Sequence, residues 1–253
     1  MDFNVQSMKY FFITILSFLF ISCSKNNTSD TQPANDAKDS TCQITAVKMV
    51  SATDSFTTVL FYNSAGKLIK TNDDAGTISL YTYDGNRIFK SYSNVLPMID
   101  TTTVNNFGYI TTFVHNTNSF ILSNSFFYTS DTVLSYSVIR SPLITSPPDT
   151  TTYHFTDGDL TSFVTNGITY NYTYYPDKSE QPGDFSIYYQ MSQQSALAYS
   201  NKHLTKSYSG NSFSEEYTYT FDGSGKILSL TVHSVNTQSS KTVTYYYTYA
   251  CHL

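Results

Sequence analysis

The sequence predicts an all-β fold, an antiparallel meander of hairpins curled into an open or closed barrel-like sheet. Three observations support this prediction. The 253-residue chain contains 23 Tyr and 18 Phe but no Trp, and aromatic and β-branched residues favour strands. Apolar and polar residues alternate with a period of two in many segments. Turn residues, above all Asp or Asn followed by Gly, recur between these segments and are typical of hairpins.

Residues 1–22 have the features of a secretory signal peptide. Lys9 supplies a positive charge, residues 10–21 form a short apolar core, and Ser22 is a small residue at the expected cleavage site. The core is shorter than the roughly 20 apolar residues of a membrane-spanning helix. Because Asp2 is unusual in a cationic leader, we expect translation to start at Met8.

The end of this leader, Ser22-Cys23, resembles a bacterial lipobox, and Phe20 departs from its usual aliphatic residue. The resemblance implies that Cys23 is lipidated and becomes the mature N-terminus, which would attach the protein to the outer membrane through its acyl chains. The alternative is an ordinary cleaved signal with a chance cysteine.

Residues 23–41 are expected to form a flexible tether. The stretch 26–41 holds no apolar residue larger than Ala, so it cannot bury enough surface to offset its chain entropy. Lipoproteins of Bacteroidota that reach the outer face often carry an acidic run just after the lipidated cysteine. Residues 24–27 lack one, so the sequence leaves the periplasmic or surface face undecided.

Residues 42–253 are expected to form a single all-β domain. This length is sufficient for one sizeable hydrophobic core. The chain has a net charge of −5 and no cluster of basic residues. Nucleic-acid binding is therefore not expected, because phosphate recognition needs concentrated Lys and Arg.

Two further cysteines, Cys42 and Cys251, lie at the two ends of this domain. Outside the cytoplasm a disulfide can persist, and we expect these two residues to be bonded. The bond would require the first and last strands to be neighbours. The alternative is a pair of buried free thiols.

A loose repeat runs through the domain, consisting of aromatic residues, a turn with glycine, a charged residue and an aliphatic residue. Each copy is typical of a β-hairpin. Around the last copy, Tyr217, Tyr219 and Phe221 share one face of the predicted strand. The copies span residues 61–68, 81–88, 153–160 and 219–227.

Three other segments complete the predicted layout. Residues 141–150 contain Pro142, Pro147 and Pro148 and are expected to form a loop. Residues 192–199 (SQQSALAY) form the one predicted short helix. Residues 241–251 are expected to form a final, tyrosine-rich strand that ends at Cys251.

The hairpins around 66–84 resemble the YD repeat of Rhs-type proteins. The whole domain more closely resembles a Bacteroidota lipoprotein family of unknown function with a described porin-like fold. The matching pieces are the strand at Cys42, the hairpins, the segment 192–199 and the strand 245–251. The resemblance implies a porin-like fold and supplies no active site. A membrane-spanning barrel is not expected, because the alternate strand faces carry Thr, Ser and Asn where lipid-facing residues should be apolar.

No catalytic or metal-binding set is recognisable in the sequence, and no cofactor is expected. The histidines lack metal-binding spacing, and a Gly-x-Ser-x-Gly elbow is absent. Most carboxylates fall at positions where hairpin turns favour Asp. A catalytic pair of carboxylates stays an alternative, because such pairs are recognised by their distance in space and not by their spacing in the sequence. The histidines are His115, His154, His203, His233 and His252, and the carboxylates considered are Asp73, Asp74, Asp157, Asp159, Glu215, Glu216 and Asp222.

The tyrosines are the best candidates for a functional role, because an aromatic face can bind a sugar while the hydroxyl remains at its edge. The leading interpretation is a non-enzymatic, membrane-anchored lipoprotein that binds a ligand such as a glycan. The alternatives are a structural or interaction subunit of an envelope complex and, third, a carboxylate-dependent glycan hydrolase.

Four triplets also resemble the O-glycosylation sequon of Bacteroidota, in which Asp precedes Ser or Thr. They begin at Asp39, Asp100, Asp131 and Asp149. The resemblance implies that the hydroxyl residue after each Asp carries a glycan. Intact-mass analysis of the native protein tests this expectation, and a mass without hexose additions would contradict it.

Overall fold

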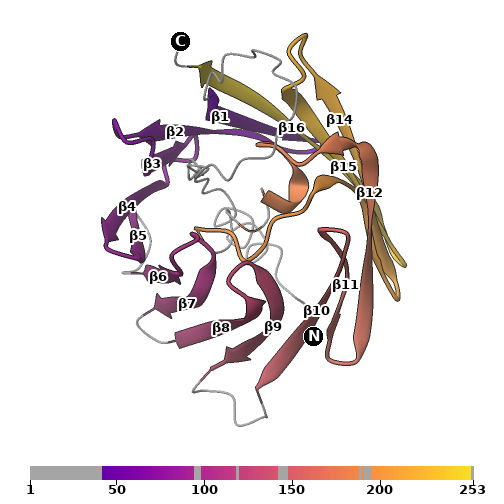
Figure 1. Ribbon diagram of the computed structural model, residues 1–253. Coiled ribbons are helices and arrows are strands. Elements are labelled where there is room, and N and C mark those ends of the chain that lie inside the picture. The colour runs from indigo at the N-terminus through magenta and orange to yellow at the C-terminus, as the bar shows by residue number, and fades with distance from the viewer. Residues whose placement is uncertain are drawn as a thin grey trace, which may run out of the picture.

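The computed structural model describes residues 42–93, 98–117, 120–141, 148–187, 190 and 195–251. These residues form sixteen antiparallel strands that close into a barrel, in which each strand pairs with its neighbours in sequence and β1 pairs with β16 (Figure 1). The predicted meander is therefore confirmed, and the sheet is closed. The signal peptide, the tether with Cys23 and most of the predicted loop lie outside the described residues.

The strands vary between six and twelve residues in length. They are β1 (Cys42–Ser51), β2 (Ser55–Tyr62), β3 (Leu68–Asp73), β4 (Ile78–Asp84), β5 (Arg87–Ser93), β6 (Ile99–Val104), β7 (Ile110–Thr117), β8 (Phe120–Ser130), β9 (Val133–Arg140), β10 (Asp149–Thr156), β11 (Asp159–Thr165), β12 (Ile168–Ser179), β13 (His203–Gly210), β14 (Phe213–Phe221), β15 (Ile227–Asn236) and β16 (Ser240–Cys251).

A ring of eight aliphatic side chains fills one end of the barrel. Each odd-numbered strand contributes one of them within its first three residues, and all are at most 3% exposed. Because odd strands of a meander all start at the same rim, these side chains meet in one layer. They are Ile44, Leu68, Ile88, Ile110, Leu134, Leu160, Leu204 and Ile227.

The strand ladder skips one residue shortly after this aliphatic residue in seven of the eight odd strands. Such a β-bulge bends a strand and increases its twist, so a regular series of bulges curls the sheet toward closure. The skipped residues are Thr45, Ile69, Thr111, Ser135, Thr161, Lys206 and Leu228.

Six inward-facing tyrosines support six of these seven bulges, all except the one at Ser135. Each donates its hydroxyl to the carbonyl of the residue just before the skipped one, at 2.6–2.9 Å. In β5, which has no bulge, the equivalent position on the following strand is Val104, which has no hydroxyl. The donors are Tyr62, Tyr83, Tyr128, Tyr174, Tyr219 and Tyr249.

Replacing Tyr83 with phenylalanine is expected to lower the free energy of unfolding by about 1–2 kcal/mol, because it leaves the Leu68 carbonyl without this donor. Urea unfolding measures the change. Tyr246→Phe is the matched control, since Tyr246 is 49% exposed on the outer face. Equal effects from the two substitutions would contradict a supporting role for the inner tyrosine.

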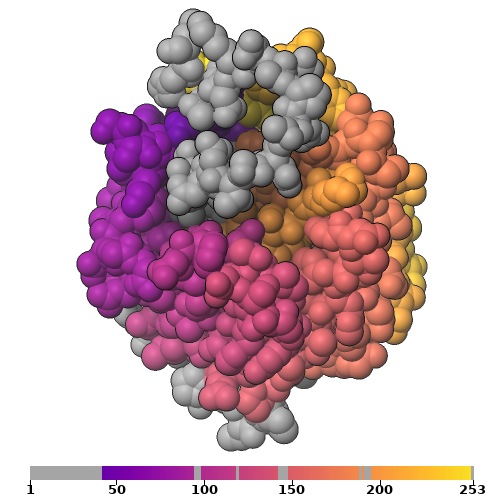
Figure 2. Space-filling view, in the orientation of Figure 1, coloured from indigo at the N-terminus to yellow at the C-terminus, as the bar shows by residue number. Residues whose placement is uncertain are grey.

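The linker between β12 and β13 lies inside the same end of the barrel. Figure 1 shows it crossing the ring of strands, and Figure 2 shows its atoms, in orange, seated among the strand ends. Ala196 and Ala198 are buried, and the Ile110 backbone donates a hydrogen bond to the Leu197 carbonyl at 2.9 Å. The linker therefore closes this end, and the aliphatic ring packs against it.

The linker also contains the short helix, which lies earlier than predicted. Residues Phe185–Ile187 and Gln190 are helical, residues 195–199 are not, and residues 192–194 lie outside the described part of the chain. The buried Gln190 side chain holds the backbone of residues 198–199 in a non-helical conformation. Its amide accepts hydrogen bonds from the Ala198 and Tyr199 backbone, at 2.7 and 3.0 Å, and donates to the Tyr199 carbonyl.

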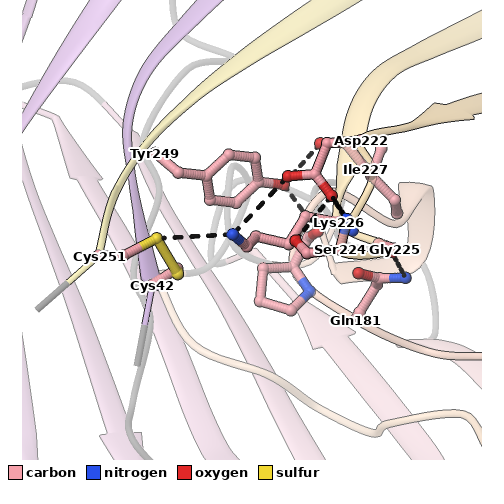
Figure 3. Close-up of polar contacts among 10 residues, drawn as sticks. Cys42, Gln181, Asp222, Ser224, Gly225, Lys226, Ile227, Tyr249 and Cys251 are labelled. Atoms are coloured by element: carbon pink, nitrogen blue, oxygen red, sulfur yellow. Dashed lines mark hydrogen bonds and ion pairs between the residues drawn. A yellow bond between two sulfur atoms is a disulfide. The ribbon is translucent and has the colours of Figure 1, made fainter. Parts of the chain in front are cut away.

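The barrel seam lies between β1 and β16, where Cys42 pairs with Cys251 in register and the two sulfur atoms are bonded. Figure 3 shows the surroundings of this disulfide. The Lys226 ammonium lies 3.6 Å from the Cys251 sulfur, and the Tyr249 hydroxyl donates to the Ile227 carbonyl at 2.8 Å. The predicted neighbouring positions of the first and last strands are confirmed.

Candidate ligand-binding site on the inner wall

Five half-buried aromatic side chains form a continuous surface on the inner side of β11–β14, which we call the aromatic wall. They face inward because Tyr170 and Tyr172 alternate with exposed residues and share a strand face with Tyr174, whose hydroxyl contacts the Leu160 carbonyl inside the barrel. Tyr172 and Tyr208 pack against the hydrophobic core. The wall consists of Phe163, Tyr170, Tyr172, Tyr208 and Phe213.

Cross-strand pairing brings these rings together. Phe163 pairs with Tyr170 and Tyr172 pairs with Tyr208, with ring centroids 4.8 and 4.9 Å apart. Gly210 allows the close packing, because a Cβ atom there would lie 2.5 Å from the Tyr170 ring. The partial exposure of the wall means that solvent reaches these inward-facing rings.

A carboxylate lies beside the wall, since Glu215 is directly opposite Tyr208 on the neighbouring strand. The Tyr217 hydroxyl donates to Glu215 Oε2 at 2.6 Å, and the Ser234 hydroxyl donates to Oε1 at 2.8 Å. A carboxylate has about four lone-pair sites, so Glu215 retains capacity to accept hydrogen bonds from a ligand.

A row of polar side chains crosses the inner wall of β4–β7. Tyr81, Lys90, Asp100 and His115 are successive partners in the strand register. Lys90 is 1% exposed and Asp100 is 3% exposed. The Lys90 ammonium lies 4.6 Å from the centroid of the Tyr92 ring, and burial lowers the pKa of Lys90 to about 8 although Asp100 opposes the shift.

Asp100 is the acceptor that joins this row. One carboxylate oxygen accepts a short hydrogen bond from the Tyr92 hydroxyl, and the other lies 2.6 Å from His115 Nδ1. Sequence reasoning considered His115 only as a metal ligand and Asp100 only as part of a sequon, and it did not select Lys90 or Tyr92. The available signal was the alternation in β5, which places Lys90 on the same face as Ile88 and Tyr92.

A second buried polar cluster holds the linker. Asp184 accepts hydrogen bonds from the Tyr219 hydroxyl at 2.8 Å and the Thr205 backbone at 3.1 Å, and Glu180 accepts from the Ser186 hydroxyl at 2.7 Å. Burial raises the pKa of Glu180 to about 8, with a further contribution from Asp184, and burial raises the pKa of Asp184 to about 6.

These raised pKa values predict a loss of stability with increasing pH. The folded protein keeps protons that the unfolded chain loses near its ordinary values of 4.5 and 3.8, so the free energy of unfolding falls as the pH rises from those values to about 8. Urea unfolding across this range measures the slope. Glu180→Gln should flatten it, whereas the exposed control Glu216→Gln should not. An unchanged slope in Glu180→Gln would contradict the assignment.

The structure places most of the carboxylates considered from the sequence in hairpin turns or on separate faces. Asp73 and Asp222 accept hydrogen bonds from backbone amides within their own turns. Asp159 accepts from the Lys202 and His203 backbone and so fixes the end of the linker. Glu215 faces inward and Glu216 outward, so these neighbours do not form a pair.

The four described histidines lie on four different strands, β7, β10, β13 and β15. His115 and His203 each lie within 2.7 Å of an aspartate, whereas His154 and His233 are exposed on strands and His252 lies outside the described residues. Within the described part of the chain, no group of three or more His, Cys, Asp or Glu side chains is placed to hold a metal ion. No described helix is long and apolar enough to cross a membrane.

The residues after the sequon aspartates occupy outer positions where they are described. Thr132 is exposed in the turn between β8 and β9, and Thr150 is exposed on β10. Thr101 alternates with the buried Asp100 and Thr102 on β6. The triplet at Asp39 lies outside the described residues. Glycosylation at these positions stays a prediction.

The comparison with solved structures identifies the fold. A porin-like protein from Bacteroides uniformis ATCC 8492 aligns with 82% of this chain and 96% of its own, with a TM-score of 0.60 and 18% sequence identity. The chain shares this porin-like fold. A porin-like protein from Bacteroides vulgatus ATCC 8482 aligns over 82% of this chain and 98% of its own, with a TM-score of 0.49 and 17% identity. No family model and no curated protein sequence matches the chain.

The porin-like fold implied by the resemblance is therefore confirmed. The interior carries the aliphatic ring and the inner tyrosines, and the outer face mixes exposed threonines with exposed apolar side chains such as Leu80, Ile99 and Phe127. The exposed threonines include Thr82, Thr152, Thr169, Thr173, Thr218, Thr220, Thr242 and Thr248.

Proposed function

We propose that this protein is a non-enzymatic binding protein of the cell envelope, anchored by lipid on Cys23, whose barrel binds a neutral glycan at the aromatic wall. The aromatic wall carries the proposal. Half-buried aromatic rings on an inner surface, with a few polar groups beside them, are the usual composition of a small-ligand site, and the mouths of barrels are common locations.

A sugar fits the chemistry of this wall. Its C–H faces can pack on Phe163 and Tyr170, and its hydroxyl groups can donate to the remaining lone pairs of Glu215. The lipobox resemblance at Cys23 and the polar tether at 24–41 support an extracytoplasmic, outer-membrane address. The absence of an acidic run after Cys23 leaves both faces of that membrane compatible with the proposal.

A thermal-shift screen of the soluble domain, residues 42–253, tests the proposal. The probes are neutral oligosaccharides of glucose, galactose, mannose and xylose. A ligand that binds only the folded state raises the apparent melting temperature, so at least one series is expected to stabilise the protein at millimolar concentration. Absence of a shift with all four series would contradict glycan binding.

The alternative function, a subunit of an envelope complex, is favoured by a different observation. Phe127 and Tyr136 stack on the outer face with centroids 4.5 Å apart, and both are about 40% exposed. Exposed apolar surface can mark a protein interface. Under this alternative, substituting Phe127 and Tyr136 would abolish binding to the envelope complex, whereas substituting residues of the aromatic wall would not.

A further inference from the structure

The disulfide at the barrel seam lies at the surface, beside a positive charge. Cys251, at the end of β16, is exposed, and Cys42, at the start of β1, is half-buried. The Lys226 ammonium lies 3.6 Å from the Cys251 sulfur (Figure 3). Lys226 is the residue just before β15, the strand that pairs with β16. A reagent in solution can therefore reach this disulfide, and a cation is placed at the sulfur of Cys251.

Two other titratable groups share this corner with Lys226. The Asp222 carboxylate lies 3.7 Å from the ammonium, and hydrogen bonds from the Ser224 side chain and the turn backbone lower the pKa of Asp222, so it is ionised at neutral pH. The Tyr249 hydroxyl donates to two backbone carbonyls, and burial raises its pKa, so it stays neutral. The ammonium is thus the charged group in contact with Cys251, and Asp222 opposes its effect.

A cation at one sulfur favours one direction of thiol–disulfide exchange. In this reaction a thiolate attacks one sulfur, and the other sulfur leaves faster when its thiolate is more stable. A neighbouring lysine stabilises a thiolate and lowers the pKa of the thiol. The contact with Lys226 therefore favours Cys251 as the leaving group and Cys42 as the sulfur that is attacked.

We propose that the seam disulfide is a directional thiol-exchange site, at which an external dithiol attacks Cys42 and Cys251 leaves as a thiolate beside Lys226. The reagent's thiolate forms a bond to the Cys42 sulfur, and the electron pair of the broken disulfide moves to Cys251. The second thiol of the reagent then attacks the first, its proton passes to the released Cys42, and the reagent becomes a disulfide. The site lies apart from the aromatic wall, and its chemistry does not depend on the proposed glycan binding.

The direction of attack can be measured on the wild-type sequence. Residues 24–253 keep the whole barrel and contain Cys42 and Cys251 as their only cysteines. The probe is mercaptoethanol, a small neutral monothiol, with an acid quench and peptide mass spectrometry to locate the first mixed disulfide. We expect it on Cys42 about three times as often as on Cys251, or more, although Cys251 is the more exposed residue. Equal labelling or a preference for Cys251 would overturn the proposed direction.

The rate of reduction by dithiothreitol tests the role of Lys226. Lys226→Met should slow the reduction about threefold or more, because the Cys251 thiolate loses its neighbouring cation. Asp222→Asn should speed it, because this variant removes the negative charge that opposes the ammonium. The matched control is Lys48→Met, which should leave the rate unchanged, since Lys48 is exposed further along β1 from Cys42.

A merely structural role for Lys226 gives the opposite result. If Lys226→Met only loosened this corner of the barrel, the disulfide would become more accessible and its reduction would be faster. A rate in Lys226→Met that equals or exceeds the wild-type rate would therefore overturn the proposal. The mixed-disulfide map uses the wild-type sequence, so it decides the direction of attack even where a variant fails to fold.

Discussion

Replacing Asp100 with leucine is expected to lower the free energy of unfolding by about 3–5 kcal/mol. The substitution removes the carboxylate that the register places opposite the buried Lys90, so the lysine loses the nearby negative charge that opposes the lowering of its pKa by burial. It also removes the acceptor for Tyr92 and His115. Urea unfolding, followed by circular dichroism, measures the loss.

Two further variants distinguish the contribution of charge to this loss of stability from the contribution of packing. Lys90→Met should cost less, because Asp100 keeps its hydrogen bonds to Tyr92 and His115. Adding Lys90→Met to Asp100→Leu should recover part of the stability, since it removes the buried ammonium group that Asp100→Leu leaves without a nearby carboxylate. A double variant that is less stable than Asp100→Leu alone would contradict this electrostatic account.

Removing the disulfide is expected to have an effect of similar size. Cys42 and Cys251 are separated by 209 positions, and in the chain-entropy model a bond across such a loop stabilises the folded state by up to about 5 kcal/mol. The β1–β16 ladder remains in the reduced protein, so the barrel should still fold. For a domain of this size the melting temperature should fall by about 2–4 °C for each kcal/mol lost.

The measurement compares the melting temperature of the wild-type domain with that of Cys42→Ala/Cys251→Ala. A reducing agent should lower the wild-type value and leave the variant unchanged. If reduction leaves the wild-type melting temperature unchanged as well, the disulfide does not stabilise the closed barrel. Loss of the β-sheet signal in the double variant would show that the ladder alone cannot close the seam.

The sequence predicted more of the fold than of the candidate ligand-binding site. Turn chemistry and alternation identified the hairpins that carry Leu68, Ile88, Leu160 and Ile227 in the aliphatic ring. The other four ring residues do not follow a recognised copy. Ile44 lies in the first strand, Leu204 follows the long linker between β12 and β13, and the turn before Leu134 has Asp131-Thr132 without glycine. The feature that all eight odd strands share is the buried aliphatic residue, not the turn before it. Whether that residue is buried depends on closure of the barrel.

The inner polar groups could not be assigned in the same way. A lysine in a strand is ordinarily exposed, and only the closed register shows that Lys90 faces Asp100 inside the barrel. The cluster of the half-buried Glu180 and the buried Asp184 depends on the linker folding back between the strand ends, which no local pattern encodes. The aromatic wall depends on strand pairing in the same way. Tyr170 and Tyr172 alternate with polar residues in the sequence, but Tyr208, the partner of Tyr172, comes from a later strand.

The central claim is that the inner aromatic wall binds the ligand, and calorimetric titration tests it most directly. The best oligosaccharide of the thermal-shift screen is titrated into the wild-type domain, Tyr208→Ala and the outer-face control Phe127→Ala. We expect Tyr208→Ala to raise the Kd by about tenfold or more, and Phe127→Ala to leave it unchanged. An unchanged Kd in Tyr208→Ala, with a loss of binding in Phe127→Ala, would contradict the account.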